Sequence, residues 1–115
     1  MKIGEVSLNT NDVVRLADFY KQLFGIDNGS SDEVHQTLIA EDTQLTVWND
    51  GFPKNNRNQN ISLAFTVDDI EQEYRKLLSM GVEMIEKPTL RPWGAVNMSF
   101  YDPDGNVIYF RSFPK

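Results

Sequence analysis

A few side chains in this chain could do chemistry on a small molecule or hold one in place. Glu5 offers a carboxylate, His35 is the single histidine, and Trp48 and Trp93 are the two tryptophans. A carboxylate can act as a general base, as a metal ligand or as the counter-ion of a cation, and an indole face attracts aromatic and cationic groups. The sequence does not indicate nucleophilic catalysis, because the chain has no cysteine and no Gly-x-Ser-x-Gly segment.

Each of these side chains also has a plain structural explanation. Glu5 could be an exposed acid without a role, and His35 could be exposed or structural rather than a proton carrier. Trp93 lies between Arg91-Pro92 and Gly94, so we expect it where a loop enters a strand, either at a pocket mouth or as a hydrophobic plug. The alternatives for Trp48 are a ligand contact or a core position.

The charge balance narrows the possible partners. Eleven Lys and Arg against seventeen Asp and Glu give a net charge of -6, which repels nucleic acid phosphates and anionic lipids. We therefore expect no nucleic acid partner, no membrane partner, and a cationic or neutral small-molecule ligand. The lack of cysteine excludes disulfides and thiolate metal ligands. Because the first residues hold no apolar stretch of the signal-peptide kind, we expect a cytoplasmic protein.

The chain contains an internal repeat. The segment 5–13 and the segment 62–70 share an alternating strand pattern, an acidic helix cap and an apolar helix start. Apolar residues at helical spacing continue through 13–24 and 70–78, and each predicted helix ends at a glycine, Gly25 or Gly81. Two similar modules are therefore expected.

Strand patterns follow each predicted helix. They cover about 34–40 and 44–49 in the first half and about 82–86, 95–101 and 107–112 in the second, with tight turns at 41–43 and 102–105. The Asn-rich stretch near 50–60 is typical of a linker or a long loop. We expect one domain spanning 1–115, with module one at about 1–49, a linker at about 50–60 and module two at about 61–115.

Side-chain alternation indicates which sheet face could form a pocket. Val6 and Leu8 in the first strand, and Leu63, Phe65 and Val67 in the second module, form apolar rows that can pack under the helices. The opposite rows are small or polar, and they combine with aromatic residues on the later strands, as a small-ligand cavity requires. Arg111 could bind a carboxylate there, or be a solvated charge at a strand end. The candidate ligand-binding residues are Glu5, Ser7, Trp48, Ser62, Trp93, Asn97, Ser99, Tyr101, Tyr109 and Arg111.

In this order and spacing, several segments resemble the vicinal oxygen chelate superfamily. They are the two strand-helix starts, Asp18-Phe19-Tyr20, Leu23-Phe24-Gly25, Trp93-Gly94 and the turn Asp102-Pro103-Asp104-Gly105-Asn106. That superfamily includes glyoxalases, bleomycin-resistance proteins, fosfomycin-resistance transferases and extradiol dioxygenases. The resemblance implies an α+β fold of two βαβββ modules that form mixed, cupped, eight-stranded sheets around a cavity.

The resemblance also implies where a metal would bind. Metal-using members place His, Gln or Glu ligands on the first and last strands of each module, and these positions fall here on Glu5, on Val47 (or Leu45), on Ser62 and on Tyr109. Only Glu5 is a competent ligand, so we expect no metal. No glycine-rich phosphate loop is present, so we expect no cofactor.

Two functions of different classes remain open. The first is a metal-free small-molecule-binding protein, resembling the members that sequester an antibiotic or another bulky aromatic or cationic compound and so confer antibiotic resistance. The alternative is a diverged lyase, isomerase or dioxygenase-type enzyme acting on a small oxygenated substrate, with Glu5 as base or sole metal ligand. Because members of this family commonly pair two chains, we also expect a homodimer.

Overall fold

The computed structural model describes residues 1–55 and 59–114 of the chain. The chain divides into two compact units, Met1–Asn56 and Arg57–Lys115. The division falls within the segment predicted as a linker, of which residues 56–58 lie outside the described residues. No helix in the described part of the chain is both long enough and apolar enough to cross a membrane.

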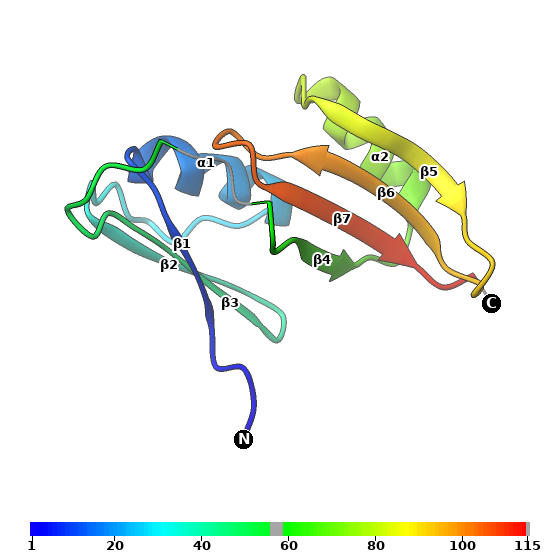
Figure 1. Ribbon diagram of the computed structural model, residues 1–115, viewed down its shortest axis with the longest axis horizontal. Coiled ribbons are helices and arrows are strands. Elements are labelled where there is room, and N and C mark those ends of the chain that lie inside the picture. The colour runs from blue at the N-terminus through cyan, green and yellow to red at the C-terminus, as the bar shows by residue number, and fades with distance from the viewer. Residues whose placement is uncertain (56–58, 115) are drawn as a thin grey trace. The chain divides into compact units, whose positions relative to one another are not determined.

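The first unit is a three-stranded sheet with one helix. Its elements are β1 (Val6–Asn9), α1 (Val13–Phe24), β2 (His35–Ala40) and β3 (Thr43–Trp48). The strand order is β1-β3-β2, with β1 parallel to β3 and β2 antiparallel to it (Figure 1). The sheet is therefore mixed, and its first strand pairs with its last.

The second unit repeats this plan with one more strand. Its elements are β4 (Leu63–Thr66), α2 (Ile70–Ser79), β5 (Met84–Leu90), β6 (Val96–Tyr101) and β7 (Val107–Ser112). The order is β4-β7-β6-β5, and β4 runs parallel to β7 while the other pairs are antiparallel (Figure 1). The α+β class and the two mixed sheets agree with the prediction from the sequence.

The two helices begin and end in the same way. The carboxylates of Asp12 and Asp69 accept hydrogen bonds from the backbone N–H groups of Arg15 and Gln72, each three residues into its helix. The glycine after each helix adopts positive φ, 69° at Gly25 and 72° at Gly81. This left-handed conformation carries little strain in a glycine and ends the helix by satisfying its last carbonyls.

Strand alternation sorts the side chains into a core face and an open face. On β3, Leu45 and Val47 are buried, as are Leu16 and Tyr20 on α1. In the second unit the buried row comprises Met98, Phe100, Ile108 and Phe110, with Ile70 and Leu77 from α2. Each core thus lies between one helix and one face of its sheet. The opposite face of each sheet does not pack against that helix.

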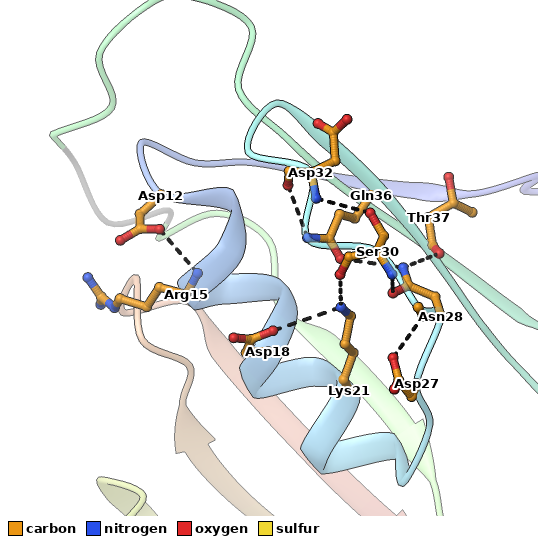
Figure 2. A network of polar contacts seen from close by, with 11 residues as sticks. Asp12, Arg15, Asp18, Lys21, Asp27, Asn28, Ser30, Asp32, Gln36 and Thr37 are labelled. Carbon is orange, nitrogen blue, oxygen red and sulfur yellow. Dashed lines mark hydrogen bonds and ion pairs between the residues drawn. The ribbon is translucent and has the colours of Figure 1, made fainter.

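The first unit lacks the fourth strand of a βαβββ module, so the described residues form seven strands rather than eight. Residues 25–34 instead form a polar loop (Figure 2). Asp27, Asn28, Ser30 and Asp32 each accept a hydrogen bond from a backbone N–H two residues further on. Such local side-chain bonds compete with strand pairing for the same backbone donors, which explains the missing strand.

The predicted strand at 82–86 is also displaced, since β5 begins at Met84 and continues to Leu90. It contains Pro88 and two register shifts relative to β6. Proline is tolerated because β5 is an edge strand, where a missing backbone N–H costs no ladder bond.

The turn between β6 and β7 is organised by Asp102. This carboxylate is 4% exposed, and one oxygen accepts from the backbone N–H groups of Asp104 and Asn106, both at 2.9 Å. The other oxygen accepts from the side-chain amide of Asn106 at 2.9 Å. The aspartate therefore satisfies several donors that a buried turn would otherwise leave without partners.

We expect Asp102→Ala to lower the free energy of unfolding by about 2 kcal/mol, because three partly buried donors lose a charged acceptor. Chemical denaturation followed by circular dichroism measures the change. The matched control is Asp42→Ala in the turn between β2 and β3, where Asp42 is exposed, and its effect should stay within about 0.5 kcal/mol. Equal effects of the two variants would contradict the structural role given to Asp102.

Candidate functional site

The open face of the first sheet is polar. Parallel pairing of β1 with β3 places Ser7 beside Thr46 and Asn9 beside Trp48. Antiparallel pairing of β2 with β3 places His35 beside Trp48. Trp48 thus lies on the open face rather than in the core, and it is half-buried.

Glu5 lies just before β1 and is exposed. One of its carboxylate oxygens accepts hydrogen bonds from the Thr46 hydroxyl at 2.6 Å and from the Gln44 amide at 3.2 Å. Thr46 is 3% exposed, so this donor is fixed in place. The carboxylate is therefore oriented by β3, although it is not enclosed in the way that a desolvated general base would be.

The family's metal positions are not assembled into a site by the described residues. Val47 and Leu45, the positions transferred for the second ligand, are 0% and 1% exposed and lie on the core face of β3. That transfer was wrong, because the residues of β3 that share the face of Glu5 are Gln44 and Thr46. In the described part of the chain no group of three or more His, Cys, Asp or Glu side chains could hold a metal. A hydroxyl and an amide beside one carboxylate do not fit the family's divalent ion.

The second sheet carries an open pocket on the face away from α2. Its volume is about 430 Å³, within the range of small-molecule sites. It is lined by residues of β4, β6 and β7, by the loop between β5 and β6, and by the residue just after β7. These residues are Ala64, Trp93, Ala95, Asn97, Tyr109, Arg111 and Phe113.

Strand register brings the polar and aromatic members of this lining together. Ala64 on β4 pairs with Tyr109 on β7, and Asn97 on β6 pairs with Arg111 on β7. The Arg111 Nε donates to the Thr66 hydroxyl at 3.0 Å, and its guanidinium carbon lies 5.2 Å from the ring centre of Phe113. The guanidinium is thus held from two sides.

Trp93 is placed by a tight turn. The Arg91 N–H donates to the Ala95 carbonyl at 2.8 Å, the Gly94 N–H donates to the Arg91 carbonyl at 3.0 Å, and Gly94 has φ 96°. Arg91 is also bonded to Glu86 at 2.8 Å, and this bond holds the pKa of the Glu86 carboxyl below its ordinary value. The turn presents Trp93 at the pocket with 68% of its surface exposed.

Asn97 is the least satisfied polar residue of the pocket. Its Oδ1 is buried and has no hydrogen-bond partner among the described residues. A buried acceptor without a donor costs about 1 to 3 kcal/mol. The oxygen is therefore a group that a ligand donor, or a water, would satisfy.

The remaining predicted site residues do not belong to the lining of this pocket. Ser99 shares the face of Asn97, but it is 3% exposed and does not line the pocket, so the prediction that it contacts a ligand is not supported by its burial. Tyr101 lies further along β6, where it pairs with Val107. Ser62 is exposed just before β4, and Ser7 is exposed on the first sheet.

The candidate list from the sequence lacks five residues that line the pocket or orient Glu5, namely Ala64, Ala95, Phe113, Gln44 and Thr46. Phe113 continues the alternation of Tyr109 and Arg111 by one more step, so the period of β7 could have indicated it. Ala95 lines the pocket from the position before β6. Gln44 and Thr46 required the register of β1 against β3, which the sequence does not contain.

Comparison with known proteins agrees with this architecture. The Glyoxalase/Bleomycin resistance protein/Dioxygenase superfamily model matches residues 2–110. The uncharacterized protein YetH of Bacillus subtilis (strain 168) is 26% identical over 96% of this chain and 97% of its own length. A crystal structure of a family enzyme from Burkholderia phytofirmans PsJN superposes with a TM-score of 0.82, at 18% identity, over 99% of this chain and 100% of that one.

The chain therefore belongs to the glyoxalase/bleomycin resistance protein/dioxygenase superfamily. The crystal structure of a glyoxalase-related enzyme from Fulvimarina pelagi has the same fold, with a TM-score of 0.80 at 18% identity over 99% of this chain and 89% of that one. At such identities the likeness concerns the fold.

We expect Asn97→Leu to leave the free energy of unfolding unchanged or to raise it by about 1 kcal/mol, since leucine has the same branched skeleton of heavy atoms and removes an unpartnered buried acceptor. Urea denaturation measures the free energy of unfolding. Asn9→Leu, at an exposed position of β1, is the control and should change stability by less than about 0.5 kcal/mol. A loss of more than about 1 kcal/mol in Asn97→Leu would mean that the amide is well satisfied.

Proposed function

We propose that this protein binds a small aromatic compound against the open face of its second sheet, as a metal-free binding protein. The observation that carries the proposal is the pocket of about 430 Å³ in which Trp93, Tyr109 and Phe113 surround an arginine and an asparagine. Small-ligand sites combine apolar and aromatic walls with a few polar groups in this way.

The exposure of the aromatic rings supports the same proposal. Trp93 is 68% exposed and Phe113 is 54% exposed, although each could bury a large apolar surface. Covering such surface is favourable by roughly 25 cal/mol per Å². A flat aromatic ligand would supply that cover.

Sequestration of an antibiotic or of a similarly bulky aromatic compound is the biological role we propose, by analogy with the bleomycin-resistance part of the family. A sequestering protein needs affinity and no chemical step, which fits a site without an assembled metal centre. We also propose that the protein acts in the cytoplasm, a compartment with which the absence of cysteine is compatible.

A diverged enzyme acting on a small oxygenated substrate is the second candidate. The hydrogen bonds that orient Glu5 from Thr46 and Gln44 favour it, because an oriented carboxylate can accept a proton from a bound substrate. If the protein forms a product and Glu5→Gln abolishes its formation, the protein is an enzyme and not only a binding protein.

Purified protein can be screened by its melting temperature against aromatic compounds, antibiotics, small oxoacids and divalent metals. We expect an aromatic ligand to raise the melting temperature, and a chelator to leave this increase unchanged. Trp93→Ala should weaken the binding of a hit about tenfold, because the exposed ring is lost. Isothermal titration calorimetry measures the affinity.

The matched control is Trp48→Ala, which removes the other tryptophan from the first unit and should leave the affinity unchanged. Stabilisation by Ni²⁺, Zn²⁺ or Mn²⁺ that Glu5→Ala abolishes would contradict the metal-free proposal. If the two tryptophan variants weakened binding equally, the assignment of the binding site to the pocket of the second sheet would be contradicted.

We also propose a homodimer. Its support is β5, an edge strand of the second sheet with Leu90 69% exposed and Ile85 45% exposed. Large apolar side chains exposed on one strand favour association with a second chain.

Light scattering after size-exclusion chromatography at micromolar concentration should give twice the mass of one chain. Leu90→Lys should shift the protein towards the monomer, because a charge replaces an exposed apolar side chain of β5. Val34→Lys, at a position of the first unit that is 61% exposed, should leave the mass unchanged. A monomer in the unmodified protein would overturn the proposal.

A further inference from the structure

The charge within the pocket differs from the charge of the whole chain. The chain carries a net charge of -6, yet among the described residues Arg111 is the one charged residue in the lining, and none of these residues is an acid. A cationic ligand would therefore meet a like charge in the pocket without a counter-ion. The lining favours a ligand that brings a negative charge.

Arg111 is positioned to meet such a charge. Its Nε is bonded to Thr66 at 3.0 Å, and its guanidinium lies over the Phe113 ring. These contacts fix the side chain but do not use the two terminal nitrogens, which have no acidic partner in the described residues. By contrast, the guanidinium of Arg91 is bonded to Glu86 at 2.8 Å. A guanidinium binds a carboxylate through two parallel N–H donors, and one that is already oriented loses less freedom in doing so.

Asn97 lies beside this cation. It is the register partner of Arg111 on the neighbouring strand, and its buried Oδ1 has no hydrogen-bond partner within the described part of the chain. One side of the pocket thus offers a cation, and Trp93 and Tyr109 offer aromatic surface, whereas the Asn97 oxygen needs a donor from a water or from another part of the ligand, not its carboxylate. A ring that carries an acid group matches this distribution.

We infer that the pocket binds aromatic carboxylates, with Arg111 holding the carboxylate and Trp93 contacting the ring. This inference rests on the proposed binding function and adds the chemical class of the ligand. The net charge of the chain alone favours a cationic ligand, but a bound molecule interacts most strongly with the nearest charge, which here is the positive charge of Arg111.

The test compares three probes that share one ring system. They are 2-naphthoate, its neutral amide 2-naphthamide and the cation 2-naphthylmethylammonium, each titrated into the full chain and followed by ¹H–¹⁵N NMR at low ionic strength. We expect naphthoate to bind about threefold to fivefold more tightly than naphthamide, as an ion pair with an exposed arginine would give. The shifted resonances should include the Trp93 indole N–H.

Variants of Arg111 separate charge from shape. Arg111→Gln should remove the preference for naphthoate while leaving naphthamide affinity unchanged, and Arg111→Lys should keep only part of the preference, because lysine lacks the planar fork. Arg111→Glu should reverse the order in favour of the cation. Unchanged amide spectra away from the pocket will show that each variant is folded.

The outcomes distinguish this inference from the function on which it rests. Equal binding of naphthoate and naphthamide, or tighter binding of the cation, would overturn the carboxylate inference and leave an aromatic binding site. A preference for naphthoate that persists in Arg111→Gln would also overturn it. Absence of binding by all three probes at millimolar concentration would overturn the inference and count against the pocket as an aromatic site.

Discussion

The pairing of the first strand of each unit with its last strand is the constraint on which the candidate sites depend. β1 runs parallel to β3, and β4 runs parallel to β7. Each pairing joins segments that are distant in sequence and gives them a common open face. Glu5 meets Thr46 through the first pairing, and Thr66 meets Arg111 through the second. A shift of one residue in either register would send these side chains to the core face.

Much of the fold could be predicted from the sequence, because it is set by local patterns of residues. Asp12 with Gly25, and Asp69 with Gly81, set the bounds of the two helices through local chemistry that a sequence displays directly. The polar and apolar rows of β6 and β7 are likewise local, so the face that carries Asn97 and Arg111 could be assigned before the structure was known. Features of this kind depend on the spacing of a few neighbouring residues.

What the sequence did not reveal depends on distant or competing interactions. The metal position placed on Val47 or Leu45 was wrong because the register between β1 and β3 decides which residues of β3 share the face of Glu5. The missing fourth strand of the first unit reflects a competition in which Asp27 and its polar neighbours bind the backbone locally. Pocket volume, and the lack of a partner for the Asn97 oxygen, are properties of packing that no pattern contains.

The connection between strands also bears on the order in which the chain folds. β6 and β7 are joined by the short turn around Asp102, so their pairing closes a small loop, whereas β4 pairs with β7 across the length of α2, β5 and β6. Closing a longer loop costs more chain entropy and slows folding. We therefore expect the β6–β7 hairpin to form early and β4 to join late. The Thr66 hydroxyl that holds Arg111 arrives with β4, so the pocket is completed only when the unit itself is complete.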